Sequence, residues 1–149
     1  MDLSDLCLTD FAGKNVVLNI FPSISGPDSA ASVKKFNALA PTFENTVVLC
    51  ISLDLPFTHE RFYHAENLAN IIPLSEFRHT SFGDVYGLRI SEGPLKGLLS
   101  RAVIILDSAG KVTYTEQVTD LDNEPDYDAA VNALKTSQTD NLRHLLPQD

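Results

Sequence analysis

The sequence is poor in cysteine and has no tryptophan. Its 149 residues include only two cysteines, Cys7 and Cys50, and two thiols this far apart do not indicate a disulfide framework. No apolar run approaches the roughly 20 residues that cross a bilayer, and the acidic start MDLSDLCLTDF lacks the pattern of a signal peptide. We therefore expect a reducing, cytoplasmic setting and no contact with a membrane.

Basic residues are also scarce. The chain has 11 Lys and Arg against 20 Asp and Glu, a net charge of −9, and its cations are scattered along the sequence. Binding to nucleic acid depends on clustered Lys and Arg. Nucleic acid is therefore not an expected partner.

The residues that could hold a metal ion do not form a set. His59 and His64 are five residues apart and so do not share a helix face as an i, i+4 pair would. His79 and His144 lie elsewhere, and the acidic run from Asp120 to Asp128 lacks the spacing and the glycine of an EF-hand. We expect no metal and no cofactor, histidines that are solvated or cap helices, and an acidic loop that leads into a capped helix.

Buried strands alternate with amphipathic helices along the chain. Strands are predicted at Lys14–Phe21, Asn45–Leu53, Arg101–Leu106 and Lys111–Val118, the last two as a hairpin. Helices are predicted at Ser29–Leu39, Thr58–Asn70 and Asp126–Lys135, with a short helix near Ser81–Tyr86 in an otherwise irregular region from Ile71 to Leu99.

This order, β-α-β-α-β-β-α, predicts one α/β domain over residues 1–135. With the first two strands parallel through a helix crossover, the expected fold is a thioredoxin-like three-layer sandwich around a central mixed sheet. The C-terminal tail, residues 136–149, is predicted to form a short helix or to fray.

The junction between the first strand and the first helix is the most informative segment. Its sequence, FPSISGPDSAASVKKFN, runs from a hydrophobic strand through a Pro/Gly/Ser turn into an amphipathic helix. A thioredoxin-like fold places a reactive cysteine at such a helix start, where the helix dipole favours a thiolate. Here the position holds Ser29.

Several segments together resemble the bacterial thiol peroxidases, a branch of the peroxiredoxins. They are FPSISGPDSAASVKKFN, NTVVLCISLDLPF, RFYHAENL, YGLRISEGPLKGLLSRAVIILD and EPDYDAAVNALK, and the resemblance covers nearly all of residues 2–135. It implies a homodimer and, for an active member, reduction of peroxides at the expense of thioredoxin. The family carries an N-terminal hairpin and a first strand before its DLSD-like segment, and this sequence begins at that segment.

The resemblance also assigns the site residues. The family proline falls at Pro22 and the family arginine at Arg101, so these two are retained. The threonine position holds Gly26, the peroxidatic cysteine position holds Ser29, and the resolving cysteine position holds Tyr63. Both redox sulfurs of the family are therefore expected to be absent.

Peroxide reduction needs a thiolate that attacks oxygen and passes through a sulfenic acid. A serine hydroxyl does neither, and Asp28 beside Ser29 would oppose a thiolate there. The sequence thus predicts a silent homologue with a binding or regulatory role. The alternative is a working enzyme: a thioredoxin-dependent peroxidase for hydrogen peroxide or alkyl hydroperoxides that uses Cys50 or Cys7, or another chemistry in the same pocket.

Further expectations concern single side chains. Ser29, or Asp28 before it, is predicted to cap the helix rather than to act as a nucleophile. Cys50 is predicted to be a buried, inert thiol and Cys7 to be partly exposed. Asp28 and Arg101 are hypothesised to form an internal ion pair.

Overall fold

The computed structural model describes residues 3–145, with side chains through residue 136. Its centre is a five-stranded mixed sheet with the strand order β3-β2-β1-β4-β5. The strands are β1 (Asn15–Ile20), β2 (Thr46–Ser52), β3 (Ile72–Ser75), β4 (Arg101–Leu106) and β5 (Val112–Val118). The helices are α1 (Pro27–Leu39), α2 (Pro56–Ala65), α3 (Ser81–Val85) and α4 (Tyr127–Leu145), with 3₁₀ turns η1 (Leu8–Phe11) and η2 (Ala40–Thr42).

Strand direction follows from the connections. β1 runs parallel to β2 and β2 parallel to β3, each pair joined through a helix, whereas β4 is antiparallel to both β1 and β5. The predicted hairpin is therefore confirmed, as is the helix crossover between the first two strands. Parallel neighbours need such crossovers, because a tight turn can join only antiparallel strands.

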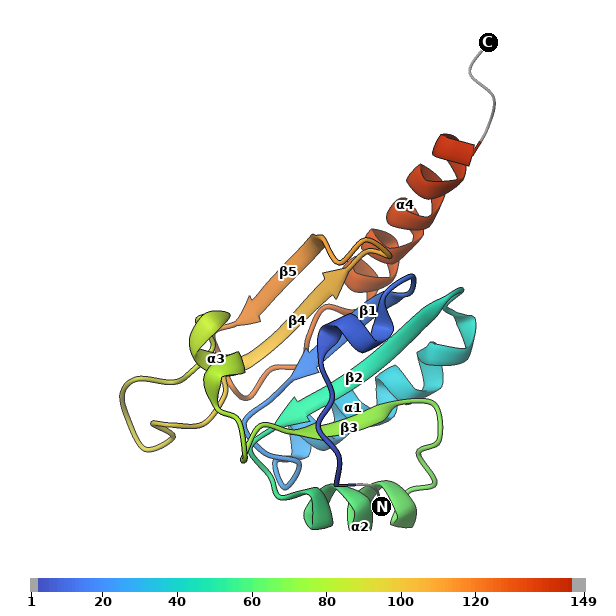
Figure 1. Ribbon diagram of the computed structural model, residues 1–149. Coiled ribbons are helices and arrows are strands. Elements are labelled where there is room, and N and C mark those ends of the chain that lie inside the picture. Colours follow the sequence, from blue (N-terminus) through green and yellow to red (C-terminus); the bar gives the residue numbers. More distant parts are fainter. Residues whose placement is uncertain (1–2, 146–149) are drawn as a thin grey trace.

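Alternate residues of the central strands build two hydrophobic cores. On one face Val17, Val48, Cys50 and Val103 pack with residues of α1, α2 and α4. On the other face Val16, Leu18, Leu49 and Ile104 pack under η1, α3 and the loops around them. This period of two is the strand pattern, and it yields the three layers expected from the sequence. Figure 1 shows α1 and α4 on one side of the sheet and the N-terminal segment crossing the other.

The structure differs from the predicted elements at several places. α2 ends at Ala65 rather than Asn70, and Asn67 lies in the left-handed region with φ 54°, which an α-helix does not use. β3 was not predicted, because it has four residues and contains Pro73; an edge strand accepts proline where a central one does not. α4 continues to Leu145 as one helix, so most of the predicted tail extends it, and residues 146–149 lie outside the described residues.

Among residues 3–145, none of the helices combines the length and the apolar character that a membrane-spanning segment needs.

Candidate functional site

The candidate site lies where β1 and β2 end. β1 leads through residues 21–26 into α1, and β2 leads through residues 53–55 into α2. The backbone N–H of Phe21 donates to the carbonyl of Ile51 at 3.1 Å, so strand pairing continues up to this edge. In α/β sheets the carboxyl ends of adjacent parallel strands are the usual place for a site.

Helix α1 begins two residues earlier than predicted. Its N-cap is Gly26, which makes no side-chain cap, and Pro27 occupies the first helical position. Proline suits that position because its φ is already helical and it has no N–H to satisfy. The prediction that Ser29 or Asp28 caps the helix is therefore wrong. Ser29 lies inside the first turn and is only 1% exposed.

Arg101 and Ser29 meet, although they are 72 residues apart in sequence. Arg101 begins β4 and is 3% exposed; its Nη1 donates to Ser29 Oγ at 3.2 Å and its Nη2 to the carbonyl of Leu121 at 3.1 Å. Its Nε has no hydrogen-bond partner among the described residues. The structure thus brings two of the predicted site residues into direct contact.

The hypothesised ion pair between Asp28 and Arg101 does not form at contact distance. Neither carboxylate oxygen of Asp28 lies within 4.0 Å of a guanidinium nitrogen of Arg101. That guanidinium donates instead to Ser29 Oγ and to the carbonyl of Leu121. Burial lowers the pKa of Arg101, and the Asp28 charge opposes that effect. Asp28 therefore acts on Arg101 electrostatically, from a longer range.

Tyr63 belongs to a different group of contacts. It is buried on α2 against Cys50 and His59, with its ring centroid 5.7 Å from that of His59. Burial raises the pKa of the Cys50 thiol to about 12, and burial likewise raises the pKa of Tyr63. Cys50 is thus the buried thiol that was predicted, and Cys7 is exposed on the N-terminal segment.

A buried polar chain connects α1 to Cys50. Ser32 Oγ donates to the carbonyl of Ser29 at 2.8 Å, and Asn19 Nδ2 lies 3.1 Å from Ser32 Oγ and 3.7 Å from Cys50 Sγ. Sequence reasoning missed this chain. Its signal was present in Asn19, a polar residue inside an otherwise apolar strand, since buried amides need partners.

Asp54 joins the two loops at the edge of the site. Its Oδ1 accepts from Ser23 Oγ at 2.9 Å, and its Oδ2 accepts from the Ile24 backbone N–H at 2.7 Å and from Ser52 Oγ at 2.6 Å. Ser52 Oγ also lies 3.0 Å from His59 Nε2. The β1–α1 loop is therefore tied to the end of β2 by one carboxylate, a contact that the sequence did not predict.

His59 corrects another prediction. It is 2% exposed rather than solvated, and burial lowers the pKa of its imidazole while Asp54 opposes the shift. His59 lies one turn before Tyr63 and shares its inward face, so its burial follows from helical spacing. Ser52, His59 and Asp54 do not form a hydrolase triad: the carboxylate bonds to the serine instead of orienting the histidine, and Ser52 is fully buried.

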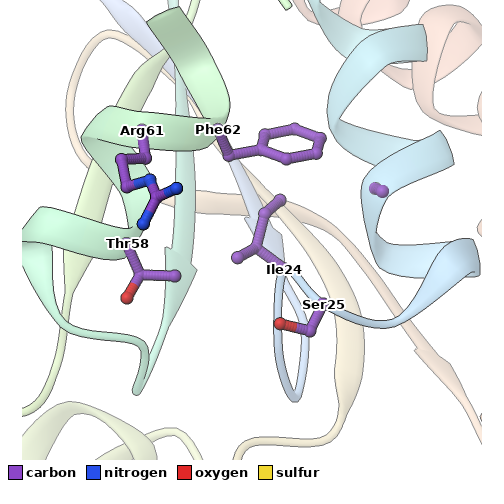
Figure 2. A pocket seen from close by; sticks show the side chains of 6 residues that line it. Ile24, Ser25, Thr58, Arg61 and Phe62 are labelled. Atoms are coloured by element: carbon purple, nitrogen blue, oxygen red, sulfur yellow. The ribbon is translucent and has the colours of Figure 1, made fainter. Parts of the chain in front are cut away.

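A cavity of about 520 Å³ opens between the β1–α1 loop and α2, next to the turn that holds Ser29. It is lined by Ile24, Ser25, Ala30, Thr58, Arg61 and Phe62. Figure 2 shows the Phe62 ring above Ile24, with Arg61 and Thr58 on one side and Ser25 on the other.

Comparison with known proteins places this arrangement in a family. Residues 1–131 match the model of the Redoxin family. The chain belongs to the Redoxin family. It is 51% identical to the thiol peroxidase of Corynebacterium glutamicum over 133 residues. This aligned region covers 89% of this chain and 80% of that protein.

Solved structures agree with the thiol-peroxidase and peroxiredoxin relationship. A peroxiredoxin-like protein from Aquifex aeolicus is 38% identical, with a TM-score of 0.80 over 84% of this chain and 72% of that one. A thiol peroxidase from Chromobacterium violaceum is 25% identical, with a TM-score of 0.83 over 92% of this chain and 79% of that one. The thioredoxin-like fold and the family resemblance read from the sequence are thus confirmed.

Within this Redoxin-family chain, the predicted site residues separate into groups. Ser29 and Arg101 touch each other, Gly26 is the N-cap residue of the helix on which Ser29 lies, and Pro22 is buried at the start of the same loop. Tyr63 instead contacts the core around Cys50. No group of three or more His, Cys, Asp or Glu residues in the described part of the chain could hold a metal ion.

Proposed function

We propose that this Redoxin-family chain is a thiol-peroxidase homologue without cysteine-based peroxidase activity, whose scaffold serves a binding or regulatory role. One observation carries the proposal: the side chain that faces the buried Arg101 from the first turn of α1 is the hydroxyl of Ser29, at 3.2 Å. An arginine beside a helix start stabilises a thiolate. Ser29 provides no group that this environment could convert into one.

The proposal includes an assignment of positions. By resemblance to the thiol peroxidases, Ser29 stands at the peroxidatic position, Tyr63 at the resolving position and Gly26 at the threonine position, with Pro22 and Arg101 retained. Reduction of a peroxide forms a sulfenic acid on the attacking sulfur and breaks the O–O bond, and a second thiol then recovers the enzyme. Neither sulfur is available at the assigned positions.

The alternative is an active, thioredoxin-dependent peroxidase that reduces hydrogen peroxide or alkyl hydroperoxides with another cysteine. The presence of Cys50 keeps this alternative open. Its environment argues against it, since the thiol is fully buried and its pKa is raised to about 12. At neutral pH about one such thiol in 10⁵ would be ionised. Cys7 is exposed, and it lies on the N-terminal segment, away from α1 in sequence.

From the resemblance we also infer a homodimer in a cytoplasmic setting. Size-exclusion chromatography with light scattering tests the first inference, and a stable monomer at micromolar concentration would contradict it.

The decisive experiment measures peroxide consumption with thioredoxin, thioredoxin reductase and NADPH. We expect no turnover above background for the wild-type protein and for its Cys50→Ala and Cys7→Ala variants. Ser29→Cys returns a thiol to the Arg101 environment, but it keeps the opposing charge of Asp28 and adds no resolving cysteine, so we expect no sustained turnover from this variant either. Wild-type turnover that disappears in Cys50→Ala or in Cys7→Ala would overturn the proposal in favour of the alternative.

A further inference from the structure

The cavity between the β1–α1 loop and α2 has the dimensions of a small-molecule site. Its volume of about 520 Å³ lies within the range of ligand pockets, roughly 300–1,000 Å³. Such pockets are mostly apolar, with a few polar groups that orient the ligand. Here Ile24, Ala30 and Phe62 supply apolar surface, and Ser25 and Thr58 supply hydroxyls.

Arg61 is the single charged residue that lines this cavity. Thr58, Arg61 and Phe62 have the i, i+3, i+4 spacing that places side chains on one face of α2, and Figure 2 shows them bordering the same hollow. No hydrogen bond or ion pair joins Arg61 to another described side chain. In a chain of net charge −9, an arginine at an apolar hollow without an acidic partner is a cation available to a ligand.

Some other cations of the chain have acidic partners. Lys34 Nζ lies 3.3 Å from a Glu66 carboxylate oxygen, and Arg89 forms short ion pairs with Glu76 and Asp84. Among the described side chains Arg61 is not alone in lacking an ion pair, since Lys14, Lys35, Lys96, Lys111 and Arg101 form none either, but it is the one cation that lines this cavity. The charges around the cavity also limit the charge of its ligand, because the cavity offers one guanidinium and the surrounding chain is acidic. A monoanion fits this balance better than a phosphate or a dicarboxylate.

The apolar walls of the cavity are held in place before any ligand arrives. The Ile24 backbone N–H is bonded to Asp54, which fixes the loop on one side. On the other side the Phe62 ring has Lys34 Nζ at 5.9 Å from its centroid and packs against the main core. A pre-formed pocket avoids the ordering cost that weakens binding.

We propose that this cavity binds a small organic monocarboxylate with an apolar body of about six to ten carbons, a size suited to a pocket of this volume. Arg61 receives the carboxylate through charge-assisted hydrogen bonds, and the apolar body lies between Ile24, Ala30 and Phe62. No bond is made or broken. This inference rests on the proposed binding role and gives it a ligand class. The ligand would bridge the turn that holds Ser29 and the helix that holds Tyr63.

The test is a ¹⁵N–¹H NMR titration of the full-length protein with sodium hexanoate at constant ionic strength. We expect shifts confined to residues 24–30 and 58–62, with a Kd of about 1 mM, as expected for a ligand of this size. 1-Hexanol, which has the same body without the charge, and sodium acetate, which has the charge without the body, should each bind at least about tenfold more weakly.

Three variants sharpen the test. Arg61→Gln should weaken hexanoate binding by about tenfold or more, and Ala30→Leu, which fills the cavity from a half-buried position, should abolish it. Arg78→Gln is the matched control, because it removes an equal charge from the separate groove beside Asp5. Binding should be unchanged in that variant. Unaltered dispersion of the remaining NMR signals verifies that each variant is folded.

Three results would overturn the inference: no shift at about 20 mM hexanoate, well above the expected Kd; equal affinity of Arg61→Gln and wild type; or shifts that map to the separate groove that Asp5 and Arg78 line. The outcome is independent of the peroxidase assay. Peroxide turnover would contradict the proposed function without altering hexanoate binding, whereas absent binding would contradict only the ligand assigned here.

Discussion

Removal of the Asp54 carboxylate tests whether one side chain holds the two loops of the site together. Asp54 accepts hydrogen bonds from Ser52 Oγ at 2.6 Å, from the Ile24 N–H at 2.7 Å and from Ser23 Oγ at 2.9 Å. Hydrogen bonds to a charged group contribute about 1.5–3 kcal/mol each. Because Asp54 is half-buried and water can replace part of this network, we expect Asp54→Ala to lower the free energy of unfolding by about 3 kcal/mol in total.

The substitution Asp54→Asn should cost less, for a geometric reason. The Ile24 N–H can only donate, so the amide oxygen of an asparagine would stay on it. The amide NH₂ would then face Ser23, whose hydroxyl can turn to accept. All three contacts survive in neutral form, and we expect a loss of about 1 kcal/mol.

Urea unfolding followed by circular dichroism gives both values, and thermal unfolding should place Asp54→Ala about 6–12 °C below wild type. Hydrogen exchange at the Ile24 amide should accelerate in Asp54→Ala before the sheet amides do. The exposed Glu92→Ala serves as the control and should change stability by less than about 0.5 kcal/mol. An Asp54→Ala variant as stable as that control would refute the reasoning.

Three further predictions concern other positions. Gly83→Ala should destabilise by about 1–3 kcal/mol in urea unfolding, because an added Cβ would lie 2.5 Å from Leu99 Cδ2 and 2.6 Å from Arg89 Nη2. Gly26→Ala is the comparison: its nearest atom would lie at 3.4 Å, so this variant should lose only the N-cap preference for glycine and should cost less than Gly83→Ala. Burial lowers the pKa of His59, so the unfolded chain binds more protons than the folded one at the same pH. The free energy of unfolding should therefore fall as pH drops below about 6.5, by up to about 1.4 kcal/mol per pH unit, until the folded-state pKa is reached. A His59→Gln variant with the same pH dependence would contradict this. Cys50 should remain unmodified by a thiol reagent in the native state at pH 8 and react only on unfolding. Mass spectrometry after timed alkylation measures this, and fast labelling of the native protein that is absent from Cys50→Ala would contradict the burial of Cys50.

Local patterns were sufficient for much of the fold. The nearly continuous apolar character of residues 15–20 and 101–106 predicted β1 and β4, and the hairpin to β5 followed from a short turn between two strand patterns. β3 was not predicted, because four residues that include a proline show too little periodicity to indicate a strand. Its place at the edge is supplied by pairing with β2, a contact between distant residues that a local pattern does not encode.

The candidate site divides in the same way. The composition of the strand–turn–helix junction pointed to Ser29, and a family resemblance pointed to Arg101; the structure then brought the two to 3.2 Å. Helix capping was predicted wrongly because Ser and Asp are good caps wherever they occur, while Pro27 decided where the helix begins. His59 was expected to be solvated or to cap a helix because no set of metal ligands included it, although its own face of α2 points into the core.

The sequence by itself determined the fold class, the family relationship and the absence of a cysteine from the first turn of α1. These depend on which residues are present and on their local order. Only the tertiary structure decided that Asp54 ties the two loops together, that Asn19 reaches Cys50 and that Arg61 borders an apolar cavity. Each of these depends on where a side chain ends in space, and that position follows from packing between segments far apart in the chain.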